Sequence, residues 1–418
     1  MIVPSYQRRD SLALVLEALR RQDAAAAGRF EVIVVLDGST DGSVELLEAW
    51  ERERRLPGMR WVRQANAGQA AARDAGAHMA AAPVLLFVDD DVVAAPDLVS
   101  RHLAWHAAGE RIAVLGDYET LLDGRPPGVE PSLYVQFVRG WWEDMFRRRA
   151  MPGRMPNYRD FCTGNVSLRR DDYLAVGGFD PAFRGYGGED YDLGYRLLRA
   201  GVRFVADRAA RADHLHRQSL RSALRSASQE GIADVYLGRK HPELRSALRL
   251  MQHPSGRLGR ALFRLALTAS WADVAIARTG EALLAAAERL RLRGHWRALH
   301  HEVRAHAYWC GVRGALGSLE ALRAYRREAV LPEQSLELAA GIPPVAALRG
   351  FWVHGPSRVQ VTWQGDLLFT DEISYAIEES LRPFLAWWVS TRAPALAWLA
   401  DEEAITPFDH AVATRTPG

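Results

Sequence analysis

Short apolar runs alternate with helix-like segments along the first part of the chain, and this alternation restricts the fold more than any other feature. Residues 32–36 (VIVVL) and 84–88 (VLLFV) are unbroken apolar runs. Such runs are typical of strands that are buried on both faces of a sheet. Leu12, Leu16 and Leu19 recur at the spacing of one helix face. Strands of this kind, separated by helices, predict an α/β fold with a mostly parallel, Rossmann-like sheet and flanking helices.

Acidic residues follow both apolar runs. Asp37 comes directly after the first run, and Asp89, Asp90 and Asp91 come directly after the second. Ligands of open parallel sheets bind at the carboxyl ends of the strands, so we expect these carboxylates to share one site. If the chain stays extended beyond the second run, Asp89 and Asp91 point to the same side. Such carboxylates bind hard cations such as Mg²⁺ or Mn²⁺, and a cation of this kind neutralises a diphosphate.

Each of these groups also has a simpler interpretation. The aspartate run, taken alone, is better explained as an acidic turn that caps a helix starting near Pro96. Asp37 can accept a hydrogen bond from a pyrimidine N–H, but its turn also contains Ser39 and Asp41, which can cap a helix. Arg73 can pair with a phosphate, or it can form a surface salt bridge that contributes little. The metal and nucleotide interpretation therefore needs support from elsewhere in the chain.

A glycine-rich segment that ends in two acids supplies that support. Gly187 and Gly188 precede Glu189 and Asp190, and a helical pattern follows. Glycines let the backbone approach a ligand closely. The helix dipole keeps a carboxylate in the first turn ionised, and an ionised carboxylate can deprotonate a sugar hydroxyl. Simple capping of the helix is the alternative.

Taken in order, these motifs resemble the inverting glycosyltransferases of the large family 2 type, which have the GT-A nucleotide-sugar fold. The resemblance runs from Ile2 to about His216. Its elements are Val3-Pro4-Ser5-Tyr6, Asp37-Gly38-Ser39, Asn66-Ala67-Gly68 with Ala72-Arg73-Asp74-Ala75-Gly76, Asp89-Asp90-Asp91, Gly164-Asn165 and Gly188-Glu189-Asp190. Each element is modest alone, but their shared order is specific.

The resemblance implies a role for each of these positions. Contacts with the donor are expected from Pro4, Ser5, Tyr6, Asp37, Asn66, Arg73, Asp89, Asp90 and Gly188. Asp91 is expected to bind a divalent metal, Mn²⁺ or Mg²⁺, and Asp190 to act as the catalytic base, with Glu189 positioning the acceptor. A histidine after the next strand often completes such a metal site. His214 and His216 are both candidates, and position favours His214, although a structural histidine is the alternative.

Departures from the family pattern narrow this interpretation. Gln7 stands where the family usually has Asn, and Leu36 stands where it usually has another aspartate. The nucleoside contact therefore rests on Asp37 alone. No Gln-x-x-Arg-Trp motif of the processive polysaccharide synthases follows Asp190, which predicts the addition of one sugar per event.

Chain length and local patterns predict three parts. The chain has 418 residues, more than one typical domain. We expect a GT-A catalytic domain over residues 1–218, a helical region over 219–330 and a small α/β module over 331–418, in which Gln364-Gly365-Asp366 marks a hairpin. The stretch from Gly116 to Asp160 is less regular and is expected to form a mobile flap or an insertion that faces the acceptor.

Composition bears on partners and compartment. A net charge of +2 argues against a nucleic-acid partner. Cys162 and Cys310 lie far apart and form no Cys-x-x-Cys motif, so a reduced, cytoplasmic compartment is expected. No signal peptide is visible, and no uncharged apolar run approaches the ~20 residues of a membrane span. The Trp-rich stretch from Phe384 to Ala400 is better explained as a packed helix, although it leaves peripheral contact with the inner face of the membrane open.

We therefore expect a metal-dependent, non-processive glycosyltransferase. It would move one sugar from a nucleoside-diphosphate sugar, with a UDP-sugar favoured, to a sugar, lipid-linked or other glycan acceptor during glycan, polysaccharide or glycoconjugate assembly. The alternative is a nucleotide-sugar-binding scaffold without turnover, which would not need the acidic pair. A nucleotidyltransferase would want a glycine- and lysine-rich phosphate loop near the N-terminus, and the sequence has none.

Overall fold

Two compact units make up the chain in a computed structural model, which describes residues 1–23, 28–122, 130–149, 156–215, 219–254, 256–329, 333–338, 357–363 and 366–373. The first unit contains residues 1–150, 156–236 and 253–322, and the second contains residues 151–155, 237–252 and 323–418. The division into three parts expected from the sequence stays a prediction.

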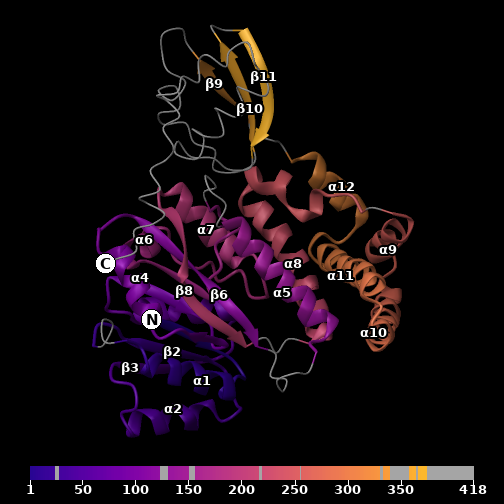
Figure 1. Cartoon of the computed structure of the whole chain (residues 1–418). Helices are drawn as coiled ribbons and strands as arrows, with labels where there is room; N and C mark the ends of the chain where they lie inside the picture. The colour runs from indigo at the N-terminus through magenta and orange to yellow at the C-terminus, as the bar shows by residue number, and fades with distance from the viewer. Residues whose placement is uncertain are drawn as a thin grey trace. The chain divides into compact units, whose positions relative to one another are not determined.

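An eight-stranded mixed sheet lies within the first unit (Figure 1). Its strands are β1 (Ile2–Ser5), β2 (Val32–Asp37), β3 (Met59–Gln64), β4 (Val84–Val88), β5 (Val92–Ala94), β6 (Ile112–Leu122), β7 (Asn165–Arg169) and β8 (Arg203–Leu215). Across the sheet their order is β3-β2-β1-β4-β7-β6-β8-β5. β1 to β4 are parallel to one another, whereas β7 is antiparallel to both β4 and β6. The expected α/β class is confirmed.

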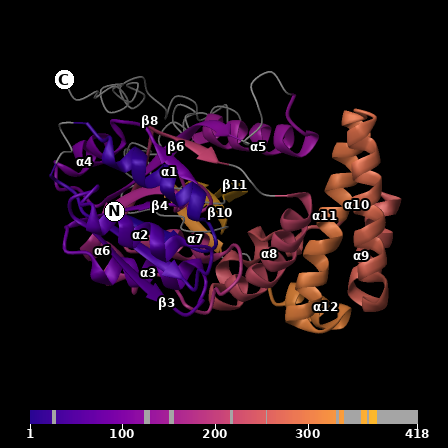
Figure 2. The same ribbon diagram turned by 90° about the horizontal axis from the view of Figure 1, so that it is seen from below.

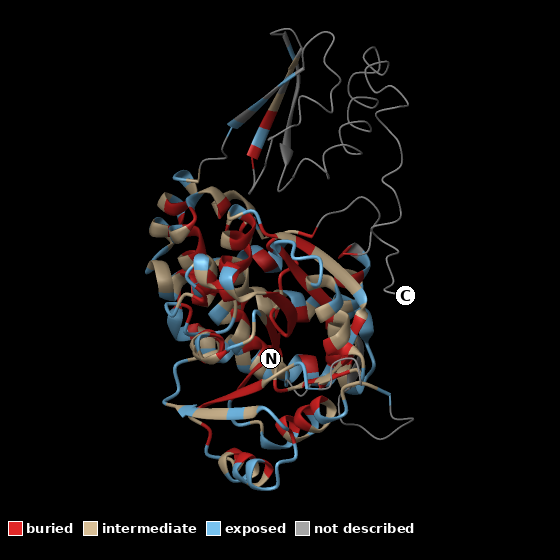
Figure 3. Cartoon of the chain, turned by 90° about the vertical axis from the view of Figure 1, so that its left-hand side faces the viewer, coloured by how far each residue is buried: buried red, intermediate tan, exposed pale blue. Residues whose placement is uncertain are grey.

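Helices cover both faces of the parallel part of the sheet, which explains its unbroken apolar strands. The helices associated with the sheet are α1 (Arg9–Arg20), α2 (Ser43–Arg52), α3 (Gln69–Met79), α4 (Leu98–His106), α6 (Arg170–Ala175) and α7 (Glu189–Arg199). Leu12 of α1 shares a core with Val3 and Val34. Gly76 of α3 meets the alternate residue, Ile2, so closely that an added Cβ would lie 2.6 Å from its Cγ2. Figure 3 shows how these strands are buried.

The strand order brings distant segments to the carboxyl end of β4. Val88, the last residue of β4, pairs with Asn165, the first residue of β7. The turn after β4 therefore lies beside the residues that precede β7. Val92 of β5 pairs with His214 near the end of β8. Three separate parts of the chain thus meet at one place.

Helices dominate the chain after the sheet, as expected. They are α8 (Leu220–Lys240), α9 (Arg257–Thr268), α10 (Asp273–Arg289), α11 (Arg293–Leu316) and α12 (Leu319–Arg327), with 3₁₀ turns at Pro242–Ala247, Arg249–Met251 and Ser270–Ala272. Another long helix, α5 (Leu133–Arg149), comes earlier in the chain and connects β6 and β7. α9, α10 and α11 lie side by side (Figures 1 and 2). Within the described residues, no helix has both the length and the apolar character needed to cross a membrane.

The prediction that residues Gly116 to Asp160 are irregular is wrong for most of that stretch. β6 extends to Leu122, and the 17-residue helix α5 follows. Leu133 and Tyr134 of α5 share a core with Trp296 of α11. Because the apolar side of α5 packs on helices that come much later in the chain, local periodicity gives little indication of it.

A three-stranded sheet belongs to the second unit. β9 (Glu333–Leu338) is parallel to β10 (Ser357–Trp363), and β10 is antiparallel to β11 (Asp366–Ile373). Pairing of Trp363 with Asp366 confirms the hairpin expected there. The Trp-rich stretch at 384–400 lies outside the described residues.

Candidate active site

The three aspartates after β4 form a turn rather than an extended segment. A backbone hydrogen bond of 3.1 Å runs from the amide of Val92 to the carbonyl oxygen of Asp89. The chain is therefore not extended here, and the condition under which Asp89 and Asp91 would point to the same side is not met. The turn instead directs the three carboxylates toward three different sets of partners.

Asp91 and His214 lie together, as a metal site requires. Nε2 of His214 is 3.4 Å from Oδ1 of Asp91, because the pairing of β5 with β8 brings this histidine next to the turn. Burial acts to raise the pKa of Asp91, but His214 and Arg8 outweigh it and hold the pKa below its usual value. An ionised carboxylate beside an imidazole fits a divalent cation. His216, the other candidate ligand, lies outside the described residues.

Arg8 belongs to the site, although the sequence motifs did not point to it. Its Nη1 donates a hydrogen bond of 2.6 Å to Oδ2 of Asp91. The guanidinium therefore contacts one oxygen of this carboxylate while His214 faces the other. The only signal in the sequence is that Arg8 lies two residues after Tyr6, just beyond the end of β1, the strand beside β4.

Asp90 is directed into the protein, where it is 8% exposed. Burial and then the neighbouring charge of Asp91 raise the pKa of Asp90 to about 8. Asp90 therefore holds a proton at neutral pH, which limits the negative charge of the turn. Its expected contact with the donor stays a prediction, and this burial argues against a direct contact.

Arg73 connects the turn after β4 with the start of α7. Its Nη2 donates a hydrogen bond of 2.7 Å to Oδ1 of Asp89, while Nη1 lies 3.5 Å from Glu189 and 3.9 Å from Asp190. The side chain is 3% exposed, so the alternative of a surface salt bridge is wrong. The expected contact of Arg73 with phosphate stays a prediction. The observed contacts indicate that its charge balances three carboxylates.

Glu189 and Asp190 begin α7, as expected, but they differ in access to solvent. The Glu189 side chain is 3% exposed and that of Asp190 is 21% exposed. Gln69 at the start of α3 donates a hydrogen bond to Glu189 Oε1. Thr163 donates to both oxygens of Asp190, from Oγ1 at 2.6 Å and from its amide at 3.3 Å. Asp190 is therefore the acid of the pair that is better placed to meet an acceptor.

Burial raises the pKa of both acids of this pair. It raises the pKa of Glu189 to about 7, with the charge of Asp190 adding to the effect. It also raises the pKa of Asp190, although Arg73 and Thr163 act in the opposite direction. The expectation that the helix dipole keeps a carboxylate here ionised stays a prediction. A raised pKa suits a base that must accept a proton near neutral pH.

Gly188 precedes the acidic pair for a steric reason. Its φ of +87° lies in the left-handed region, and an added Cβ would be 2.8 Å from Cε1 of Phe183. Only glycine is accommodated easily at this point. The expected contact of Gly188 with the donor stays a prediction, independent of this packing.

Asp37 organises the loop after β3. Its Oδ1 accepts hydrogen bonds from Gln64 Nε2 and the Ala67 amide, its Oδ2 accepts one from the Gly68 amide, and each bond is 2.8 Å long. The side chain of Asn66 donates to the Asp37 carbonyl oxygen at 3.0 Å. These bonds explain why Asp37 and the Asn66-Ala67-Gly68 motif occur together. The expected contacts of Asp37 and Asn66 with the nucleoside stay predictions.

The segment after β1 is tied to the end of β2. Pro4 and Ser5 are buried, whereas Tyr6 is 50% exposed. The amide of Gln7 donates a hydrogen bond of 3.1 Å to Ser39 Oγ, and Gln7 has a φ of +54°. Asn adopts this left-handed conformation more readily than most residues, which gives a physical reason for the Asn that the family usually has here.

Gly164 and Asn165 have structural roles next to the site. A Cβ on Gly164 would lie 2.1 Å from Oη of Tyr118 and 3.0 Å from Oδ2 of Asp89. Asn165 is buried, where its Oδ1 lies 2.9 Å from Nε2 of His102 and its Nδ2 donates to the Ala210 carbonyl oxygen at 3.0 Å. Gly164 therefore permits close packing of the site, and Asn165 joins β7 to the neighbouring elements.

Comparison with known proteins agrees with this site. Residues 1–177 match the model described as glycosyl transferase family 2, which includes the turn at Asp89 to Asp91. Residues 1–177 are therefore similar to glycosyl transferase family 2. Residues 145–218 match a second model, described as the N-terminal domain of galactosyltransferase, which includes Glu189, Asp190 and His214. The two matches together cover the residues that meet at the carboxyl end of β4.

Curated relatives are similar to this chain over about half of its length. A validoxylamine A glucosyltransferase from Streptomyces hygroscopicus subsp. jinggangensis is 36% identical over 232 residues, which is 50% of this chain and 53% of that protein. A chondroitin synthase from Escherichia coli is 24% identical over 252 residues, 51% of this chain and 34% of that protein. The chain thus spans about half the length of the first of these relatives and a third of the second.

Among solved structures, a mannosyltransferase from Pyrobaculum calidifontis in complex with GDP-Man and Mn²⁺ is similar to this chain with a TM-score of 0.45. The two are 19% identical, and the match covers 73% of this chain and 84% of that one.

Proposed function

We propose that the chain is a metal-dependent, inverting glycosyltransferase that transfers one sugar from a nucleoside-diphosphate sugar to an acceptor hydroxyl. The observation that carries this proposal is the position of Arg73, which contacts both Asp89 beside the Asp91–His214 pair and the acids Glu189 and Asp190. One guanidinium thus joins the groups suited to a cation to the groups suited to proton transfer. The match of residues 1–177 to the glycosyl transferase family 2 model supports the reaction class.

Asp190 is the group proposed to act as the base. Its carboxylate would take the proton from the acceptor hydroxyl while the acceptor oxygen forms a bond to the anomeric carbon. In the same step the bond from that carbon to the diphosphate oxygen breaks, and the nucleoside diphosphate departs with the electron pair. A single displacement of this kind inverts the anomeric centre. Thr163 orients Asp190 through two hydrogen bonds.

The donor diphosphate is proposed to lie near the turn after β4. A divalent cation bound by Asp91 and His214 would supply positive charge for the departing diphosphate. Arg8 lies on the other oxygen of Asp91 and adds a fixed cation at the same turn. Tyr6 and the loop after β3 are proposed to contact the nucleoside, with uridine favoured. Pro4, Ser5 and Asp37 would hold these segments in place.

Transfer of a single sugar, without processive synthesis, completes the proposal. The 36% identical relative carries the name of a glucosyltransferase, which supports sugar transfer from an activated donor. A sugar, a lipid-linked glycan or another glycan could serve as the acceptor. Cytoplasmic location and contact with a membrane face belong to the same proposal.

The test is a screen of nucleotide sugars with the full chain. Binding of the correct donor with Mn²⁺ or Mg²⁺ should raise the melting temperature by mass action, and turnover should release the nucleoside diphosphate. Asp190→Asn should lose about 10²-fold or more of the turnover while the donor still raises its melting temperature. Asp180→Asn, which changes a carboxylate elsewhere in the glycine-rich segment, is the matched control and should retain turnover.

Two results would contradict the proposal. Near-normal turnover of Asp190→Asn would remove the base assignment. Donor binding with no release of nucleoside diphosphate, across all donors and simple acceptors tried, would favour the alternative of a nucleotide-sugar-binding scaffold.

A further inference from the structure

A second group of potential metal ligands lies among the helices of the first unit, far along the chain from the acidic turn. Asp273 is the first residue of α10, directly after the 3₁₀ turn Ser270–Ala272. His306 and Cys310 are four residues apart in α11, so their side chains extend from the same face of that helix. α10 and α11 pack against each other (Figure 2).

Three donor atoms of this group form a small triangle. Sγ of Cys310 lies 3.4 Å from Oδ1 of Asp273 and 3.9 Å from Nε2 of His306, and Nε2 lies 3.8 Å from the same Oδ1. In a tetrahedral zinc site with bonds of about 2.0–2.3 Å, ligand atoms are separated by roughly 3.3–3.6 Å. The observed triangle is therefore close to one face of such a tetrahedron.

We propose that Asp273, His306 and Cys310 bind a thiophilic divalent cation, with Zn²⁺ as the favoured ion. On binding, the Cys310 thiol would release its proton to solvent and form a metal–thiolate bond, while Asp273 binds as a carboxylate and His306 as a neutral imidazole. A thiolate and an imidazole select Zn²⁺ or Co²⁺ over Mg²⁺, which prefers oxygen ligands alone. The carboxylate of Asp273 is 25% exposed, so a water molecule can reach the fourth position.

The protonation states of the isolated groups agree with this assignment. Burial lowers the pKa of His306, so its ring is neutral and offers a lone pair. Burial and then Asp273 raise the pKa of Cys310 to about 12, so the thiol is protonated until a metal displaces the proton.

Arg313 orients the carboxylate in the way that a metal ligand needs. Its Nη2 donates to Oδ2 of Asp273, and its Nη1 donates to the carbonyl oxygen of Ala266 in α9. Oδ1 faces His306 and Cys310, and it also accepts a long hydrogen bond of 3.5 Å from Nη1 of Arg313. Ligating carboxylates are commonly held by such additional hydrogen bonds. An ion pair between Arg313 and Asp273 alone would not require a histidine and a cysteine beside Oδ1.

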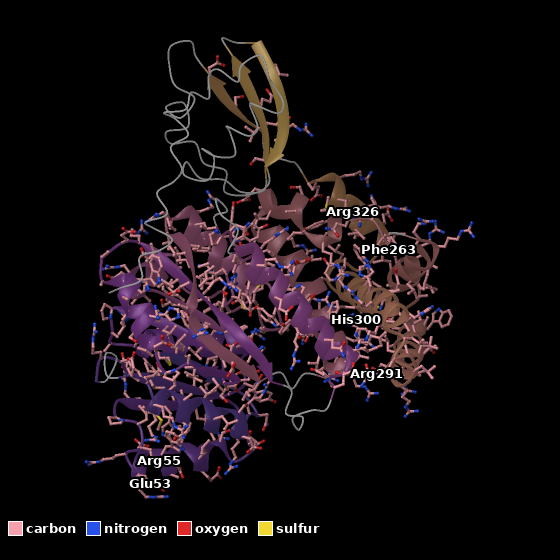
Figure 4. All side chains as sticks on the ribbon, in the orientation of Figure 1. Glu53, Arg55, Phe263, Arg291, His300 and Arg326 are labelled. Carbon is pink, nitrogen blue, oxygen red and sulfur yellow. The ribbon has the colours of Figure 1, made fainter. Side chains whose placement is uncertain are left out.

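An aromatic contact between α9 and α11 lies close along the chain to Cys310. Phe263 of α9, labelled in Figure 4, packs edge-on against Trp309 of α11 with ring centroids 4.7 Å apart. Trp309 directly precedes Cys310 in the chain. A cation at the proposed site would join the start of α10 to the middle of α11. Its role would be structural and independent of the proposed sugar transfer.

Cobalt provides the first test, because a thiolate bound to Co²⁺ gives a charge-transfer band in the near ultraviolet. The unsubstituted chain, cleared of metal, should bind one equivalent of Co²⁺ with this band, and Zn²⁺ should displace it. Cys310→Ser and His306→Ala should abolish the band, and Arg313→Gln should weaken affinity about 10- to 100-fold. Cys162→Ser and His301→Ala, the latter an exposed residue of α11, should keep the band.

A second test needs no variant. Zn²⁺ should protect Cys310 of the unsubstituted chain from an alkylating reagent, as measured by mass mapping of the labelled peptide, and removal of the metal should restore the reaction. Absence of a thiolate band from the unsubstituted chain would overturn the proposal. An unchanged band in Cys310→Ser, or equal labelling of Cys310 with and without Zn²⁺, would overturn it as well.

Discussion

The guanidinium of Arg73 forms an ion pair of 2.7 Å with Asp89 while almost completely buried. Glu189 lies 3.5 Å from the same guanidinium, so removal of this cation leaves carboxylates in the interior without compensation. Arg73→Ala should lower the free energy of unfolding by roughly 3–5 kcal/mol. Urea denaturation at pH 8, where these acids are most ionised, measures the effect.

A solvent-exposed arginine provides the control for this prediction. Arg21, which directly follows α1, is 67% exposed and pairs with Glu17, so Arg21→Ala should change the free energy of unfolding by less than about 1 kcal/mol. Equal effects of the two substitutions would show that Arg73 does not balance buried charge.

Thr163 should set the pH dependence of catalysis. Its hydroxyl donates to Oδ1 of Asp190 at 2.6 Å, which stabilises the ionised carboxylate and opposes the rise of its pKa that burial causes. Thr163→Val removes this bond and keeps the shape of the side chain. The pKa of Asp190 should rise, so the acidic limb of the kcat/KM profile should move to higher pH by about one unit.

The limb moves in this direction because a base works only when unprotonated. As pH falls through the pKa of Asp190, activity is lost, and a higher pKa means that the loss begins at higher pH. Thr40→Val, at an exposed threonine, should leave the limb in place. A lower plateau for Thr163→Val with an unmoved limb would indicate that Thr163 has only a packing role.

Metal dependence of donor binding should require the Asp91–His214 pair. Asp91→Asn removes the charge of the carboxylate, and His214→Ala removes the imidazole that lies 3.4 Å from it. In both variants the donor affinity with Mn²⁺ should fall to the value measured with a chelator. Asp10→Asn, at a side chain that is 72% exposed, should retain the metal effect.

Calorimetry with the donor identified by the screen measures these affinities. If either variant keeps a full difference between Mn²⁺ and chelator, its residue is not a metal ligand. Retention by His214→Ala alone would direct attention to His216.

The parallel part of the fold could be predicted because its information is local. Unbroken apolar runs predicted β2 and β4, and the spacing of Leu12 and Leu16 predicted α1. Both predictions are confirmed. Helix α5 was missed because its apolar residues pack on helices that come more than a hundred residues later, such as α11 with Trp296.

In the candidate site, too, some features could be predicted from the sequence and others depend on the tertiary structure. Family motifs pointed to Asp91 and His214, and the structure brings them together. The contacts of Thr163 with Asp190, and of Arg8 with Asp91, depend on how β7 and β1 flank β4. Residues 89–91 carry no turn signal of glycine or proline, so the sequence did not distinguish a turn from an extended run.

Gly164 offers a test of how tightly this site is packed. An added Cβ would lie 2.1 Å from Oη of Tyr118 and 3.0 Å from Oδ2 of Asp89. Gly164→Ala should therefore cost roughly 1–3 kcal/mol in the free energy of unfolding. Turnover should fall by at least about tenfold, equivalent to ~1.4 kcal/mol, because the same contact displaces Asp89 from Arg73.

A second substitution should relieve this clash. Tyr118→Phe removes the hydroxyl oxygen, after which the nearest ring atom of residue 118 lies 3.4 Å from the added Cβ. The double variant should recover most of the lost stability, with a coupling energy of about 1–2 kcal/mol in a double-mutant cycle. Additive losses would mean that Tyr118 is not the group that excludes a side chain at position 164. Recovery of stability without recovery of turnover would identify Asp89 as the group whose displacement matters.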